Sequence, residues 1–204
     1  RLLLGLRGLY IEAQRRNDPL TACRVAEEAA RTAPELSWAG QAVLDDRCAN
    51  ADWAGALEAL DRMKGTLEKP VYRRQRAILL TARALALEEN DRDAARLAVL
   101  DAVKLAPDLG PAAALAGRRL AEAGDQRRAG KILNAAWKLS PHPDIAEAYV
   151  NLRFGDTALA RLKRMQTLAD RNSGGIEGAL AVARAALDAR EFDTARKTLE
   201  PFLT

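Results

Sequence analysis

An alanine that recurs at a nearly constant interval is the feature of this sequence that most limits its fold. Each of these alanines follows a short polar turn by a few residues: Ala22, Ala56, Ala95, Ala129, Ala158 and Ala195. Successive members are 34, 39, 34, 29 and 37 residues apart. A period of this size holds two helices and a turn, and neighbouring repeats bury a shared core. The sequence therefore predicts a stack of helix pairs.

The turn before each alanine has a pattern of its own. In Gly124-Asp125 the glycine suits the left-handed backbone that ends one helix, and the aspartate suits the N-cap of the next helix. Four other dipeptides repeat this pattern: Asn17-Asp18, Ala51-Asp52, Asn90-Asp91 and Gly155-Asp156. We expect the Asp of each turn to cap the second helix of its pair.

Residues 110–141 are the clearest copy of the repeat. Small and apolar residues recur there at fixed spacings: Ala113, Ala116, Gly117, Leu120, Ala129, Leu133, Ala136 and Pro141. These spacings match the tetratricopeptide (TPR) pattern, with smaller side chains at several positions. Gly117 is expected to lie against Ala129, where the two helices approach most closely. The predicted fold class is all-α, a right-handed superhelical α-solenoid of TPR-like helix pairs.

The periodicity predicts helices along the whole chain. Their expected ranges are 2–16, 19–33, 37–49, 53–67, 71–89, 92–105, 110–123, 126–139, 143–153, 156–170, 175–189 and 192–203. They form one array of about six repeats: 3–36, 37–70, 71–109, 110–142, 143–174 and 175–204. The polar, glycine-containing stretch 170–175 is expected to be a mobile loop.

The composition agrees with closely packed helices, and it argues against several classes of function. Hydrophobic residues make up 49% of the chain but aromatic residues only 4%, so most of the apolar content is Ala and Leu. The net charge of +4 is too small, and its charges too interspersed, to imply nucleic acid. One His and two distant Cys residues argue against a metal site or a disulfide framework. No catalytic or nucleotide-binding motif occurs, so neither an enzyme nor a cofactor is predicted.

Several segments resemble one family, the HemY-type haem-biosynthesis-associated membrane proteins of proteobacteria. The resemblance is carried by residues 7–16, by Asp52-Trp53 with Ala56-Leu57, and by residues 106–168, 177–180 and 201–203. It is strongest from Ala106 through Leu168, a stretch that includes Lys138–Tyr149 and Gly155–Leu162. The family joins two N-terminal membrane helices to a TPR region and has no established catalytic activity. This chain looks like the TPR region alone, without those membrane helices.

The resemblance implies a scaffold anchored at the bacterial inner membrane. Two cysteines without a disulfide framework favour the cytoplasmic side for this domain. The partners that the resemblance implies are other proteins, among them enzymes of a late stage of haem biosynthesis. The alternative is a tetrapyrrole or haem carrier. His142, between two prolines in a loop, is interpreted as a surface residue because a second ligand is lacking. The oligomeric state stays open.

The first helix of each TPR pair lines the binding face, which gives a candidate surface for a partner. Its predicted residues are Arg7, Ile11, Gln14, Arg15, Trp38, Gln41, Asp45, Leu80, Arg118, Glu147, Asn151 and Arg184. Such a mixed surface suits an amphipathic or extended polypeptide. Trp38 could be an exposed anchor, but packing between repeats is favoured because aromatic residues usually bury. Trp53 and Trp137 are interpreted as structural.

Four basic clusters have two open interpretations. They are Arg73-Arg74-Arg76, Arg118-Arg119, Arg127-Arg128 and Lys163-Arg164. Flanking acidic residues favour solvated helix faces. The alternative is a positively charged strip for an anionic lipid or an acidic partner.

Overall fold

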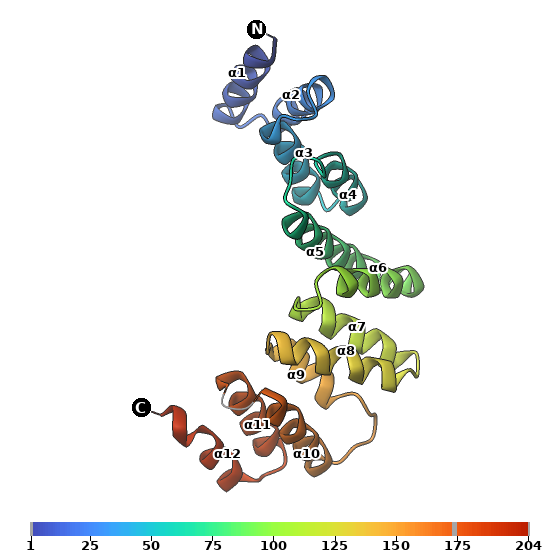
Figure 1. Ribbon diagram of the computed structural model, residues 1–204, viewed down its shortest axis with the longest axis vertical. Helices are drawn as coiled ribbons and strands as arrows, with labels where there is room; N and C mark the ends of the chain where they lie inside the picture. Colours follow the sequence, from blue (N-terminus) through green and yellow to red (C-terminus); the bar gives the residue numbers. More distant parts are fainter. Residues whose placement is uncertain (1, 173–174, 204) are drawn as a thin grey trace. The chain divides into compact units, whose positions relative to one another are not determined.

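The computed structural model describes residues 2–172 and 175–203. Within these ranges the chain consists of helices and connecting turns, without strands, which confirms the all-α prediction (Figure 1). In chain order the elements are α1 (Leu2–Arg15), α2 (Pro19–Thr32), α3 (Ser37–Ala49), α4 (Trp53–Arg62), α5 (Lys69–Leu87), α6 (Arg92–Leu105), α7 (Gly110–Glu122), α8 (Gln126–Leu139), α9 (Pro143–Val150), α10 (Ala158–Ala169), the 3-10 helix η1 (Asp170–Asn172), α11 (Ile176–Asp188), α12 (Phe192–Leu199) and the 3-10 helix η2 (Glu200–Phe202).

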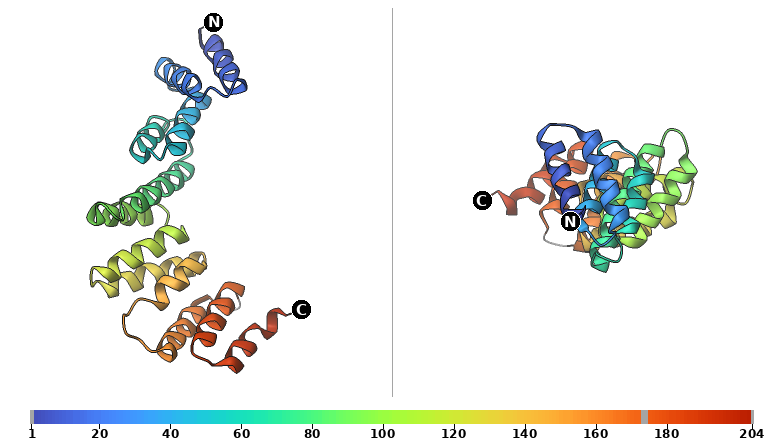
Figure 2. Two further views of the ribbon diagram at one scale, coloured as in Figure 1. Left: turned by 180° about the vertical axis from the view of Figure 1, so that it is seen from behind. Right: turned by 90° about the horizontal axis from the view of Figure 1, so that it is seen from above.

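The chain divides into two compact units, residues 1–83 and 84–204. In the first unit α1 packs on α2, α2 on α3, and α3 on α4. In the second, α7 packs on both α8 and α9, and α11 packs on both α10 and α12. The left view of Figure 2 shows α7 and α8 side by side. One continuous array over 1–204, and its handedness, stay predictions.

The turns that join paired helices follow the predicted capping pattern. Four carboxylates accept a hydrogen bond from the backbone N–H three residues further on: Asp18, Asp52, Asp91 and Asp125. The preceding residue has a left-handed backbone in three of these turns, with φ of 53° at Asn17, 54° at Ala51 and 82° at Gly124. A left-handed residue turns the chain sharply enough for the next helix to fold back.

The fifth turn departs from the prediction. Gly155 has the expected positive φ of 83°, but the N-cap of α10 is Thr157, whose hydroxyl accepts a hydrogen bond from the N–H of Ala160. Asp156 instead forms an ion pair with Arg164. The reason is that α10 begins at Ala158, two residues later than expected, which frees the aspartate for the arginine.

The alanine repeat marks the core. Five of its six members are buried: Ala22, Ala56, Ala95, Ala129 and Ala195. Ala158 is only partly buried, because it begins α10 next to the irregular turn. In the second unit the largest fully buried side chain is that of Trp137, which belongs to a core cluster with Leu133, Ile145 and Met165. The structural interpretation of Trp137 is thus confirmed.

Gly117 of α7 does lie at a close approach to α8, but against a different residue than predicted. A Cβ atom built on Gly117 would be 2.7 Å from Leu133 Cδ1 and 2.8 Å from Leu133 Cγ. Leu133 is fully buried and has no room to retreat. The small residue therefore accommodates a leucine of the next helix, one turn beyond Ala129.

Several helix ends also differ from the expected ranges. The fourth helix ends at Arg62, and the chain turns through Gly65 and Thr66, whose hydroxyl donates to the Met63 carbonyl (2.9 Å). The ninth ends at Val150 and the twelfth at Leu199. In the predicted loop 170–175, residues 170–172 form η1 and Gly175 is the N-cap of α11; residues 173–174 lie outside the described residues.

Two glycine substitutions test the close packing of α7 on α8. Gly117→Ala is expected to lower the free energy of unfolding by about 1–2 kcal/mol, because overpacking against Leu133 outweighs the gain in helix propensity. Gly130→Ala in α8 is the matched control: its Cβ would be 3.7 Å from Leu152, an ordinary contact, so stability is expected to rise by about 0.5–1 kcal/mol. Urea denaturation measures both. A stabilising Gly117→Ala would contradict the packing argument.

Candidate functional site

Four predicted surface residues lie on α1. Arg7, Ile11, Gln14 and Arg15 are all exposed there. Gln14 Nε2 donates a hydrogen bond to the hydroxyl of Tyr10 (2.8 Å), which lies four residues earlier on the same helix. This end of the predicted surface is therefore available to solvent.

The predicted residues of α3 and α5 behave less uniformly. Gln41 and Asp45 are exposed and joined by a hydrogen bond of 2.7 Å. The Trp38 ring is partly buried, and its centroid lies 5.3 Å from that of Tyr10 on α1, as expected for packing between repeats. Leu80 corrects the prediction: it is only 8% exposed and belongs to the core. The helical period of the sequence places Leu80 on the exposed face of α5, and that placement is wrong.

Three predicted residues come together in the second unit. Arg118 of α7, Glu147 of α9 and Asn151 line one hollow of about 170 Å³. Its remaining lining residues are Ala121, Glu122, Ala148 and Phe154. Arg184, on α11, is exposed but does not line this hollow.

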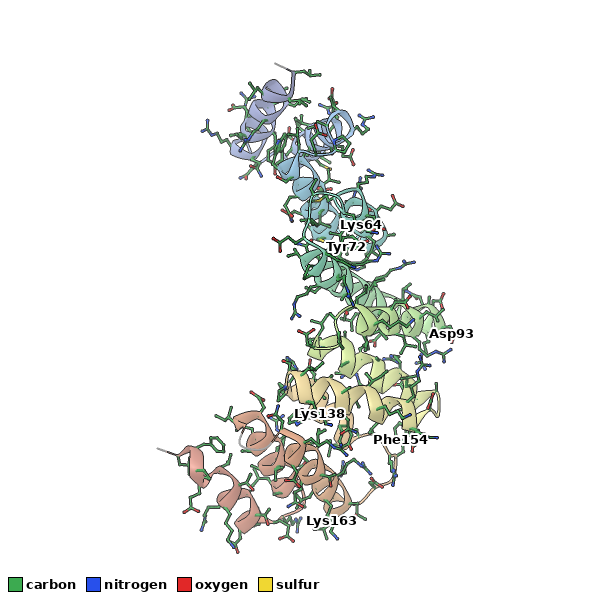
Figure 3. The ribbon with its side chains drawn as sticks, in the orientation of Figure 1. Lys64, Tyr72, Asp93, Lys138, Phe154 and Lys163 are labelled. Carbon is green, nitrogen blue, oxygen red and sulfur yellow. The ribbon has the colours of Figure 1, made fainter. Side chains whose placement is uncertain are left out.

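Phe154 is the aromatic residue of this hollow, and the predicted surface did not include it. It follows α9 in an irregular segment, is labelled in Figure 3, and is 79% exposed. A large aromatic side chain so exposed is unusual in a folded protein and is a typical anchor in protein interfaces. The expected helix 143–153 ended one residue before it, so nothing in the pattern set Phe154 apart from an ordinary loop residue.

Ion pairs hold the polar wall of the hollow in place. Arg119 Nη1 contacts Glu122 Oε2 at 2.6 Å, while its Nε and Nη2 contact Glu88 Oε1 at 3.1 and 2.5 Å. On the facing helix, the Asn151 amide donates to the Glu147 carbonyl oxygen at 3.1 Å. The neighbouring arginine, Arg118, forms no ion pair among the described residues and is exposed. The hollow thus presents a free guanidinium, carboxylates and an aromatic ring.

Exposed aliphatic side chains also gather on first helices. On α11 they are Ile176, Leu180 and Leu187, and on α1 they include Leu2 and Leu9. A spacing of seven residues is close to two helical turns, so residues seven apart share a face. These faces offer apolar contact area for another polypeptide.

His142 has a structural position. It is the N-cap residue of α9, and its Nδ1 atom accepts a hydrogen bond from the backbone N–H of Asp144 (3.2 Å). Its ring packs so closely on Gly110 that a Cβ atom there would be 2.7 Å from His142 Cγ. Across residues 2–172 and 175–203, no cluster of three or more His, Cys, Asp or Glu side chains is placed to hold a metal ion. The tetrapyrrole alternative stays a prediction.

In the part of the chain that the structure describes, no helix is both long enough and apolar enough to serve as a membrane span.

Comparisons with known proteins bear on the fold. No protein-family model matches the chain, and no curated protein matches it. Among solved structures, a tetratricopeptide repeat protein from Parabacteroides merdae is 12% identical, with 98% of this chain and 78% of that chain covered and a TM-score of 0.53. This likeness confirms the prediction of TPR-like helix pairs.

Two other solved structures are similar at a lower score. The pilF protein of Pseudomonas aeruginosa is 16% identical, covers 99% of this chain and 92% of its own, and has a TM-score of 0.48. A thermophilic TPR protein from Thermus thermophilus is also 16% identical, covers 91% of this chain and 99% of its own, and has a TM-score of 0.41.

The cysteines are partly buried rather than core residues, and one of them has an unusual partner. Cys23 Sγ donates to Asp46 Oδ2 at 3.1 Å. Burial, followed by this hydrogen bond and the charge of Asp46, raises the pKa of Cys23 to about 11. At neutral pH the group is therefore a thiol, which is a poor nucleophile.

Removing the Asp46 carboxylate should make Cys23 more reactive. In a Cys48→Ser background, Asp46→Asn is expected to lower the pKa of Cys23 and so speed its alkylation at pH 8; a fall of one pKa unit raises the thiolate fraction about tenfold. Asp45→Asn, whose charge acts on Cys48 instead, is the control and should leave the rate unchanged. Equal rates in both variants would show that Asp46 has no influence on the thiol.

Proposed function

We propose that this chain is a non-enzymatic scaffold that binds other proteins through its first helices. The observation that carries the proposal is the hollow between α7 and α9, where a 79% exposed Phe154 stands beside a free guanidinium and two carboxylates. Groups of this kind bind a polypeptide by burial of an anchor and by hydrogen bonds to its polar atoms.

The hollow fits an amphipathic segment of a partner. Phe154 supplies apolar area, and Arg118 supplies a cation that no other described residue neutralises. A carboxylate of the partner can pair with Arg118 while an aliphatic or aromatic side chain covers Phe154. The exposed aliphatic side chains of α11 would extend the contact over a neighbouring first helix.

The wider role follows from the family resemblance. HemY-type proteins are linked to a late stage of haem biosynthesis and carry membrane helices before their TPR region. On that basis the chain is the TPR domain of a protein anchored at the bacterial inner membrane, and its partners include enzymes of late haem biosynthesis. The domain would lie on the cytoplasmic side.

Two substitutions at the hollow test the scaffold. Phe154→Ala and Arg118→Glu are each expected to weaken binding of purified late haem-biosynthesis enzymes by about tenfold or more, because each removes a central contact. Leu159→Ala is the matched control, since Leu159 is also exposed and apolar but lies outside the hollow. Surface plasmon resonance on the immobilised chain measures the dissociation constants.

The outcomes separate the two parts of the proposal. Binding that is lost in the hollow variants and kept in Leu159→Ala supports both. If these enzymes do not bind, but another protein from source cells is retained with the same dependence on Phe154, the scaffold stands and the haem link fails. Equal effects of Phe154→Ala and Leu159→Ala would refute the hollow as the binding site.

A further inference from the structure

A second and larger depression in the same unit has a strongly one-sided charge. It has a volume of about 770 Å³ and lies between α8, the segment after α9, α10 and η1. We call it the basic groove, because no acidic residue lines it and its lining includes six cations: Arg127, Lys131, Lys138, Arg153, Arg164 and Arg171. Figure 3 labels Lys138 at the C-terminal end of α8.

Most of this charge is not neutralised by the protein. Arg164 forms an ion pair with Asp156 and donates from Nη1 to the Val150 carbonyl oxygen (2.9 Å), which fixes the segment between α9 and α10. The other five cations form no ion pair with any described residue. Burial, and then the like charge of Arg153, lowers the pKa of Arg164. The guanidiniums of Arg153 and Arg164 therefore repel each other.

The position of Arg127 is unfavourable for the helix that carries it. It lies in the first turn of α8, which has no acidic residue. The N-terminal end of a helix carries partial positive charge, so a cation there costs stability, whereas an anion would gain it. The carboxylate of the N-cap residue Asp125 accepts a hydrogen bond from the Arg128 N–H and offsets this positive charge at the helix end, but it does not line the groove. Arg127 does line the groove.

The length of the basic groove along α8 suits an extended polypeptide. Arg127 and Lys138 are eleven residues apart on α8, which corresponds to about 16 Å along the helix axis. That length matches about five residues of extended polypeptide. A single phosphate could reach only one or two of the cations. Between these cations, the Asn134 amide donates to the Gly130 carbonyl oxygen (2.7 Å) and to the Tyr149 hydroxyl (3.4 Å).

We propose that the basic groove binds an extended acidic segment of a partner protein. This goes beyond the scaffold function assigned to the hollow, because the two sites share no lining residue. They border on opposite sides of one short segment: Asn151 and Phe154 line the hollow, while Leu152 and Arg153 line the groove.

Other polyanions fit the groove less well. Single-stranded nucleic acid binds by stacking bases on aromatic rings, but the one ring here, Tyr149, is only 9% exposed. A lipid surface is flat and binds cations that project from a protein. The Arg164 side chain is recessed, with 15% of its surface exposed, whereas the five unpaired cations are exposed around it. An acidic peptide can enter the groove and pair with cations on both walls.

A labelled acidic peptide provides the test. Fluorescence anisotropy of a Glu-rich peptide of about ten residues, twice the length that the cations span, measures its dissociation constant for the whole chain. The same peptide with Gln in place of Glu is the ligand control. Binding is expected for the Glu peptide alone and should weaken as salt is raised, because exposed charges are screened.

Two adjacent arginines provide matched variants. Arg127→Glu is expected to weaken binding of the Glu peptide about tenfold, and Arg128→Glu by less than about twofold. Both change the net charge equally, and both place an anion in the first turn of α8, but Arg128 does not line the groove. Because the two variants change the same turn of α8 in the same way, a loss of binding confined to Arg127→Glu cannot be ascribed to unfolding of that helix.

Each other outcome overturns the proposal. Equal loss in the two variants would mean attraction by net charge alone. Tighter binding of single-stranded RNA, or of vesicles rich in anionic lipid, with the same dependence on Arg127 would assign the groove to that polyanion. Self-association of the chain that Arg127→Glu abolishes would assign it to a second copy. A failure here leaves the Phe154 result of the scaffold test untouched.

Discussion

The close approach of paired helices is the constraint on which the rest of the structure depends. A chain with few aromatic residues gains its apolar burial by bringing many short side chains together, and this requires small residues at the points of contact. The buried alanines of α2, α4, α6, α8 and α12 fill these points. Gly117 goes further, since even one methyl group there would collide with Leu133. The side of each helix that faces away from these contacts stays in solvent, and the candidate binding residues lie on such sides.

The parts of the fold that the sequence predicted are those determined locally. An N-cap depends on a side chain and a backbone N–H three residues apart, so the four capping aspartates could be read from the turns. A buried alanine depends on helical period, and five of six were placed correctly. Both the missing aspartate cap and the one alanine that is only partly buried, Ala158, belong to the turn between α9 and α10. There α9 ends early, and Asp156 forms an ion pair with Arg164 instead of capping α10.

The candidate sites were harder to predict because they depend on that irregular segment. Arg118, Glu147 and Asn151 were placed on one surface by period alone, and the hollow does contain them. Phe154 and Arg153 could not be assigned, since a loop has no period that tells which side a residue faces. Arg164 contacts both the end of α9 and Asp156, so it links the two ends of the segment that carries these residues.

The pair Arg127-Arg128 shows why a basic cluster in a sequence resists a single interpretation. Successive residues of a helix point about 100° apart, so two adjacent cations need not share an environment. Arg128 fits the solvated-face interpretation, whereas Arg127 lines a groove with five other cations and no acid. What decides between them is the position of α10 and η1, which bring Arg164 and Arg171 to the same groove from more than thirty residues away. The cations of α8 line a groove because residues of the neighbouring α10 and η1 form its other side.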